Sequence, residues 1–228
     1  MKVEFCGHSC FIISHNEHSV IIDPFLTNNP QAKKRASDVT VEAVILTHGH
    51  SDHIGDGLAI SKKNNATVIA PYELAMYCAK KGASVHPLHI GGGYDFPFGR
   101  VKLTPAWHGS AIMDDGDVYI YTGSPSGVLV TMGGKTVYHT GDTGLFGDMK
   151  LIGERNSIDV ALLPIGDNFT MGIQDALYAL KLINPKKVVP MHYNTFPIIA
   201  VDVTLFAQGA QEMNYECVVL NPGESLTL

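Results

Sequence analysis

The sequence predicts an α/β fold in which two β-sheets pack together and helices cover their outer faces. Short runs rich in Val, Ile, Leu and Thr, bounded by Gly, Pro, Asn or Asp, recur along the chain, as is typical of β-strands. Helical patterns stand between several of these runs, but less regularly than in a doubly wound sheet. No linker, low-complexity tract or internal repeat interrupts the 228 residues, so we expect a single domain over residues 1–228.

The expected strands are spread over the whole chain: 2–5, 10–13, 19–22, 43–47, 67–70, 101–105, 127–131, 136–139, 160–165, 187–191 and 217–220. Apolar residues at three- and four-residue spacing predict helices over 55–64, 72–81, 173–183 and 202–211. Gly82 is expected to end the second helix and Asn184-Pro185 the third. The segment Met132-Gly-Gly-Lys135 predicts a hairpin between two strands.

Composition and charge limit the classes of partner. The hydrophobic share of 45% is enough for a sizeable core, and the net charge of −6 argues against a nucleic-acid partner. No run approaches the roughly 18 apolar residues that cross a bilayer, and the first residues lack the apolar core of a signal peptide. We therefore expect a cytoplasmic protein with a small-molecule substrate and no membrane partner; a homo-oligomer stays open.

The four cysteines have no spacing typical of a disulfide framework or a zinc knuckle. If Cys6 and Cys10 share one strand, they lie about 13 Å apart, which is too far for a disulfide. We therefore expect reduced, buried thiols, as in a cytosolic protein.

The segment His48-Gly-His50-Ser-Asp52-His53 places four potential metal ligands within six residues at the end of a buried-type strand. Strand alternation puts His48 and His50 on one side, and Asp52 and His53 follow at the turn into a helix. Imidazoles with a carboxylate suit zinc, iron or manganese. The alternative is a polar surface turn whose histidines bind nothing.

Three later ligand-type residues make that alternative the weaker one. His108, Asp142 and His192 each follow a strand-type run. Open α/β architectures build their sites where strands end in loops. The sequence therefore predicts one shared metal site.

The order of these motifs resembles the metallo-β-lactamase superfamily over the whole chain. Other segments resemble a small bacterial group of metal-dependent hydrolases similar to the ascorbate-phosphate lactonase branch: Gly7-His-Ser9, Ile22-Asp-Pro-Phe25, Tyr138-His-Thr-Gly-Asp142, 164–172 and 190–196. The resemblance implies a four-layer αββα sandwich with two divalent metal ions. Zinc is the expected metal, with manganese, nickel or iron as alternatives.

The resemblance also implies the role of each ligand. The first metal would be held by His48, His50 and His108, and the second by Asp52, His53 and His192. Asp142 would bridge the two ions.

Two such ions would hold a hydroxide between them and polarise a carbonyl or phosphoryl oxygen. Asp52 is the expected catalytic proton carrier. We therefore expect a hydrolase of a small, anionic ester, lactone, thioester, amide or phosphodiester. The rival functions are a phosphodiesterase or nuclease, disfavoured by the acidic charge and the lack of an RNA-gripping arm, and a non-catalytic metal-binding regulatory protein.

Five residues beside the ligands also receive roles. His8 and Asn168 are expected to contact substrate, and Asp23 to orient a ligand histidine. His139, three residues before the bridging carboxylate, is expected to face away from the metals. Trp107 is expected in the core.

Overall fold

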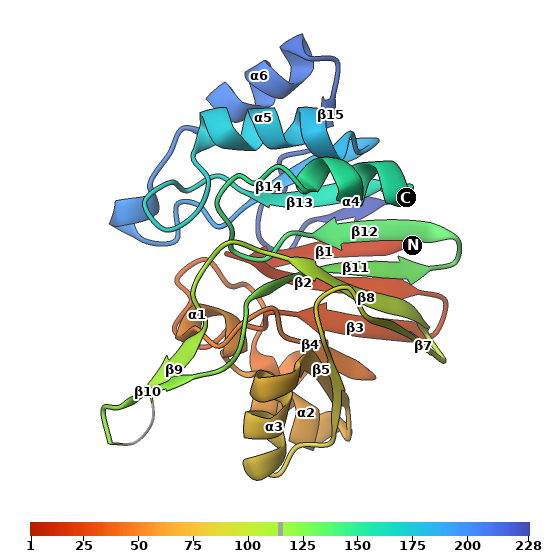
Figure 1. Cartoon of the computed structure of the whole chain (residues 1–228), viewed down its shortest axis with the longest axis vertical. Coiled ribbons are helices and arrows are strands. Elements are labelled where there is room, and N and C mark those ends of the chain that lie inside the picture. The colour runs from red at the N-terminus through yellow and green to blue at the C-terminus, as the bar shows by residue number, and fades with distance from the viewer. Residues whose placement is uncertain (114–115) are drawn as a thin grey trace.

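The computed structural model describes residues 1–113 and 116–228 and contains two seven-stranded sheets between layers of helices (Figure 1). The first sheet has the order β16-β1-β2-β3-β4-β5-β6, formed by Ser225–Thr227, Lys2–Gly7, Cys10–His15, His18–Ile22, Ala43–Ile45, Thr67–Pro71 and Val85–Leu88. The second has the order β15-β14-β13-β12-β11-β8-β7, formed by Glu216–Cys217, Lys187–Met191, Val160–Pro164, Lys135–His139, Ser126–Met132, Gly99–Pro105 and Gly93–Phe96. The short strands β9 (Ala111–Met113) and β10 (Tyr119–Tyr121) pair with each other and project from the body (Figure 1).

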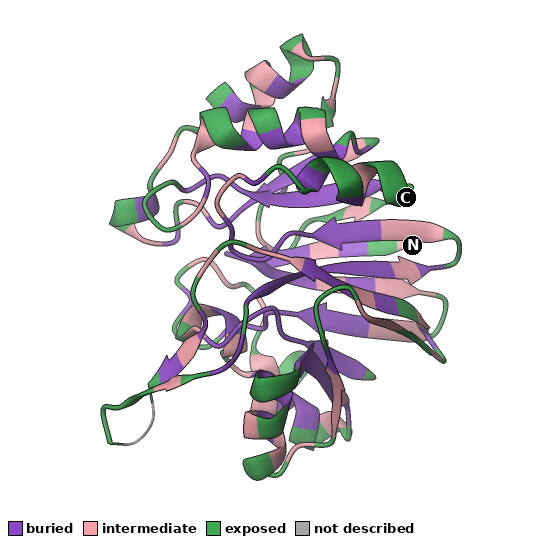
Figure 2. Ribbon diagram, viewed as in Figure 1, coloured by how far each residue is buried: buried purple, intermediate pink, exposed green. Residues whose placement is uncertain are grey.

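Helices cover the outer face of each sheet, as the sequence predicts for an αββα sandwich. In Figure 1, α2 (Gly57–Asn64) and α3 (Tyr72–Lys80) lie below the sheets, and α4 (Met149–Arg155), α5 (Ile173–Ile183) and α6 (Val203–Glu212) lie above them. Buried apolar residues form one cluster between the two sheets and one under each helical layer. Figure 2 shows this burial concentrated in the strands, with exposed residues on the outer faces of the helices.

The strand directions bring the ends of several strands to one edge. The strands β3 to β6 run parallel to one another, as do β12 to β14. Strand β8 pairs antiparallel with β11, which pairs antiparallel with β12, so β8 and β12 end at the same edge. The predicted ligands of the second sheet follow β8, β12 and β14 and therefore leave that sheet at one edge. The ligand loop after β4 of the first sheet reaches this region through Thr47, whose carbonyl oxygen accepts from the N–H of Ser126 at 3.0 Å.

The predicted helix over 55–64 is α2, which begins at Gly57, and an unpredicted one-turn helix, α1 (Ser51–Ile54), precedes it, with Gly55 and Asp56 between the two. Gly55 has a φ of +36°, and a Cβ there would lie 2.5 Å from the carbonyl oxygen of Pro24. Only glycine fits this turn, which ends the ligand-bearing helix after a single turn. The third predicted helix is found with its predicted bounds, and the left-handed Asn184 ends it.

Cys6 and Cys10 lie on different strands, so the distance of about 13 Å that a shared strand would give does not apply. Gly7, His8 and Ser9 form the end of β1 and the turn into β2, so the chain doubles back between the two cysteines. Burial and the neighbouring Cys6 raise the pKa of the Cys10 thiol. Both thiols are buried and free of a disulfide.

Several short elements were not predicted, including α4, β6, β7, β9, β10 and β16. Each is short, so its hydrophobic periodicity is weak. Among residues 1–113 and 116–228, no helix has the length and apolar character needed to cross a membrane.

Candidate metal centre

Three imidazole nitrogens converge at the first of two positions. His50 Nδ1 lies 3.0 Å from Nε2 of His48 and 3.2 Å from Nε2 of His108. Two ligands of a tetrahedral zinc ion, each about 2.0–2.1 Å from the metal, are about 3.3 Å apart. The three side chains therefore have the spacing of ligands that share one ion.

Gly49 lets this loop approach the base of the β9–β10 hairpin. A Cβ at this position would collide with the hydroxyl oxygen of Thr122. The N–H of Gly49 donates a hydrogen bond to Ser110 Oγ at 3.1 Å, and Ser110 Oγ lies 2.7 Å from Thr122 Oγ1. A side chain here would push the first histidines out of place.

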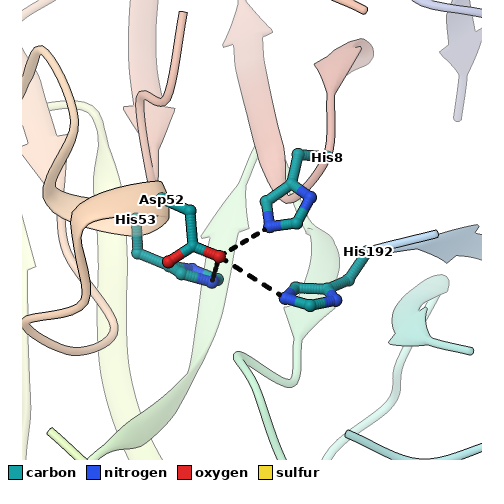
Figure 3. Close-up of side chains that lie close together, drawn as sticks. All are labelled: His8, Asp52, His53 and His192. Atoms are coloured by element: carbon teal, nitrogen blue, oxygen red, sulfur yellow. Dashed lines mark hydrogen bonds and ion pairs between the residues drawn. The ribbon is translucent and has the colours of Figure 1, made fainter. Parts of the chain in front are cut away.

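The second position is formed by Asp52, His53 and His192. Asp52 Oδ2 lies 3.9 Å from His53 Nε2 and 3.8 Å from His192 Nε2 (Figure 3). Asp52 and His53 come from α1, whereas His192 follows β14 with a left-handed φ of 53°.

Asp142 lies between the two positions. Its Oδ2 is 2.9 Å from His192 Nε2, 3.2 Å from His53 Nε2 and 3.6 Å from His108 Nε2. One carboxylate oxygen thus contacts histidines of both groups, which is the position that a bridging ligand would take.

Asp23 determines which nitrogen of two ligand histidines carries the proton. His53 Nδ1 lies 2.7 Å from Asp23 Oδ2, so its Nδ1–H donates to the carboxylate and its Nε2 faces the centre. Burial opposes protonation of His53, but Asp142, Asp23 and Asp52 raise its pKa, and a bound cation would take the place of the proton on Nε2. The hydroxyl of Thr47 donates to the same carboxylate at 2.6 Å. The Thr47 oxygen must then accept from His48 Nδ1, 2.9 Å away, which leaves the lone pair of His48 Nε2 facing the site. The sequence-based expectation for Asp23 fits this geometry.

The donor set fits divalent cations. His53 Nε2 and Asp142 Oδ1 are buried and have no hydrogen-bond partner in the described part of the chain. Buried polar atoms are rarely left without a hydrogen-bond partner, so two such atoms among other ligand-type groups indicate a site for a cation. Burial lowers the pKa of His48 and so favours the neutral imidazole that binds metals. Burial opposes ionisation of Asp142, but His192 and His53 hold its pKa below the usual range.

The ring of His8 lies next to Asp52 and points toward its carboxylate (Figure 3). Its buried ring places Nε2 3.0 Å from Asp52 Oδ2 and Nδ1 2.8 Å from Thr195 Oγ1. Burial lowers the pKa of His8 to about 4, despite the neighbouring Asp52, so the ring is neutral near pH 7. A neutral ring has one proton, and the carboxylate can only accept, so Nε2–H donates to Asp52 and Thr195 donates to Nδ1.

The backbone of His8 also supports the second position. The N–H of His192 donates to the carbonyl oxygen of His8 at 2.9 Å. The turn at His8 thereby holds two ligand candidates, one through its side chain and one through its main chain. The assignment of His8 to substrate binding stays a prediction, while these contacts support a positioning role.

A cavity of about 190 Å³ opens onto the centre. Its lining consists of His50, Asp52, His108, Asp142, Phe169 and His192. Asn168, predicted to contact substrate, is exposed next to this lining but is not part of it, and its assignment stays a prediction. Phe169 was not among the predicted site residues, although it lies in segment 164–172, whose sequence resembles the hydrolase group; a large aromatic residue among polar ones was the available signal.

Trp107 is not a core residue. Its side chain is 70% exposed beside the ligand candidate His108. The prediction was wrong because the apolar run of β8 ends at Pro105, and Trp107 already lies in the loop that leaves the sheet.

His139 points away from the centre, as predicted. Its Nε2 lies 2.9 Å from the carbonyl oxygen of Ser9, and its Nδ1 accepts from the N–H of Gly141 at 3.1 Å. Its Nε2 therefore joins β12 to the turn after β1, and its Nδ1 holds the loop that follows β12. This role is structural.

Comparisons with known proteins agree with the geometry. A sequence profile for a beta-lactamase superfamily domain matches residues 18–193, a segment that contains all seven candidate ligands. A UPF0173 metal-dependent hydrolase of Bacillus cereus strain B4264 is 55% identical over 229 residues, with 100% of both chains covered. Another from Anoxybacillus flavithermus strain WK1 is 53% identical over 228 residues, again with 100% of both covered.

A solved structure gives the same result at the level of the fold. Igni18, described as a novel metallo hydrolase from the hyperthermophilic archaeon Ignicoccus hospitalis KIN4/I, superposes with a TM-score of 0.91 at 39% sequence identity. The match covers 100% of this chain and 97% of that one.

Proposed function

The chain belongs to the metallo-β-lactamase superfamily and is a metal-dependent hydrolase, and on this premise we propose that it hydrolyses a small ester, lactone, thioester, amide or phosphodiester at a dinuclear metal centre. The observation that carries the proposal is the convergence of seven ligand-type side chains on two adjacent points. His48, His50 and His108 would hold the first ion, Asp52, His53 and His192 the second, and Asp142 both. The imidazole-rich set favours zinc, with manganese, nickel or iron as alternatives.

When bound, the two ions would supply Lewis acidity, which lowers the pKa of water and polarises the carbonyl or phosphoryl oxygen of the substrate. The side chains of the protein supply orientation and proton transfer. Asp52 lines the cavity and is 28% exposed at its side chain, so a substrate and water can reach it. Burial opposes its ionisation, but His53 and His8 lower its pKa, so the carboxylate is ionised near pH 7 and free to accept a proton. The lowered pKa also makes it a weak base, so a proton that it takes up passes readily to the leaving group.

The test is a metal titration followed by a hydrolysis screen. We expect elemental analysis to find two divalent ions per chain. The zinc-, manganese- and nickel-loaded forms are then assayed on lactones, esters, thioesters, amides and bis-p-nitrophenyl phosphate. Turnover should stop on chelation and return on reloading.

Each other outcome has a distinct meaning. Protein that takes up no metal after reloading would contradict the dinuclear centre. Two bound ions without turnover of any substrate would support a metal-binding regulatory protein. Preference for the phosphodiester, with binding that weakens steeply as salt rises, would support a nuclease.

A further inference from the structure

The cavity at the centre is small and almost wholly made of the ligand set. Its volume of about 190 Å³ is below the roughly 300 Å³ of a typical ligand pocket, so it can enclose the reacting group and few further atoms. Phe169 is the one residue of its described lining outside the seven candidate ligands. The rest of a substrate must therefore lie at the mouth, beside Phe169.

Two exposed aromatic residues stand close to the cavity in the chain: Phe169 belongs to its lining, and Trp107 directly precedes the lining residue His108. Phe169 is 53% exposed and Trp107 is 70% exposed. Both of their loops are anchored on Thr143, the residue after Asp142. Thr143 Oγ1 accepts from the N–H of Trp107 at 2.9 Å, and its carbonyl oxygen accepts from the N–H of Met171 at 3.0 Å. The loops of both aromatic residues are thus tied to the residue that follows the lining residue Asp142.

The cavity offers no cationic side chain. No Lys or Arg belongs to its lining in residues 1–113 and 116–228. A substrate with a negative charge away from the reacting group would find no partner there, whereas an apolar group would cover exposed aromatic surface. Covering such surface is favourable in proportion to the apolar area removed from water.

We propose that Phe169 and Trp107 form a subsite for an uncharged alkyl or aryl group attached to the scissile bond, so that the substrates are apolar esters or lactones. This inference rests on the proposed function and narrows it. The negative charge expected in a substrate would then develop only in the transition state, close to the metals.

The experiment compares three γ-lactones with the same reacting ring: γ-butyrolactone, γ-octalactone and a γ-lactone whose side chain of similar length ends in a carboxylate. We expect kcat/KM, measured by pH-stat, to be highest for γ-octalactone and lowest for the carboxylate. Each methylene group that packs on the aromatic surface should raise kcat/KM by up to about fourfold. Phe169→Ala and Trp107→Ala should each lower kcat/KM for γ-octalactone by about tenfold more than for γ-butyrolactone.

Tyr178 provides a matched control. It is 53% exposed, as Phe169 is, but lies on α5 outside the cavity lining. Tyr178→Ala should leave the ratio of the two lactone rates unchanged. Equal effects of Phe169→Ala on both lactones, or a wild-type preference for the carboxylate, would overturn the subsite.

A binding measurement separates this inference from the proposed function. Trp107 is the only tryptophan of the chain, so intrinsic fluorescence reports on the mouth without turnover. The ketone 2-pentylcyclopentanone, which cannot be hydrolysed, should shift the emission to shorter wavelength, and Phe169→Ala should weaken its binding. If this shift occurs in protein that hydrolyses none of the esters or lactones, the proposed function fails and the subsite stands. If hydrolysis occurs without any shift, the subsite alone fails.

Discussion

Replacing His8 by asparagine should loosen the second metal and leave the first in place. His8 has a φ of 60°, a left-handed conformation that asparagine tolerates better than alanine does. The shorter amide can take the place of Nδ1 toward Thr195 but cannot reach Asp52 in place of Nε2. The variant therefore removes one hydrogen bond, the 3.0 Å contact to Asp52 Oδ2, without straining the backbone.

The size of the effect follows from the charge of the acceptor. A hydrogen bond to an ionised group contributes about 1.5–3 kcal/mol, and loss of a group that orients a metal ligand typically costs about 10–100-fold in metal affinity. We expect a loss of that size at the second position. His48, His50 and His108 have no hydrogen bond to His8, so affinity at the first position should change by less than about threefold.

The assay is calorimetric titration of metal-free protein with zinc, supported by the visible spectrum of the cobalt(II) form. His8→Gln, whose amide can reach the position of Nε2, should recover most of the affinity. Thr195→Val should weaken the second ion in the same direction because the ring loses the 2.8 Å hydrogen bond that fixes its tautomer, whereas Thr195→Ser should not.

If His8→Asn protein binds both ions with wild-type affinity, His8 does not position Asp52 for the second metal. If kcat/KM then fell only for particular substrates, His8 would be the substrate contact predicted from the sequence. A uniform fall in melting temperature with unchanged metal binding in all four variants would give His8 and Thr195 a purely structural role.

Three further predictions follow from other contacts. Asp142→Ala should abolish binding of the metal pair and lower kcat by more than His139→Ala does. His139→Ala should retain both ions but lower the free energy of unfolding by about 2–4 kcal/mol, because two buried backbone groups lose their hydrogen-bond partner. Metal analysis and urea unfolding measure the two effects. Asp23→Asn should lower metal affinity about 10–100-fold in a zinc titration, because one amide oxygen cannot serve all three donors. Asp159→Ala should lower the free energy of unfolding by about 1–3 kcal/mol at pH 7. Burial opposes ionisation of Asp159, but hydrogen bonds from Lys186, the Thr136 N–H and Lys135 lower its pKa, so the difference from wild type should shrink as the pH falls below about 4.

The layered α/β fold and the candidate ligands could be predicted because both depend on short-range patterns. Alternation at a strand end places His48 and His50 on one side whatever the rest of the chain does. Asp142 and His192 could be added because side chains that follow strands of one sheet meet at one edge. The cytoplasmic location, the oligomeric state and the single-domain organisation stay predictions.

Contacts between distant segments could not be predicted. His8 meets Asp52 across 44 residues and Thr195 across 187 residues, and no local pattern encodes either contact. The same limit explains Cys10, whose distance from Cys6 depends on where the first turn falls.

The sequence by itself determined which residue types stand at strand ends, and hence the superfamily, the metal-dependent chemistry and the candidate ligands. The tertiary structure decided which side chains are covered and which nitrogen of each histidine keeps a free lone pair. Asp23 accepts from three groups of one loop and helix, and Phe169 and Trp107 are exposed although both are large aromatic residues. Tautomer and exposure depend on the atoms that pack against a group in space, whereas strand and helix periodicity depends on neighbours along the chain.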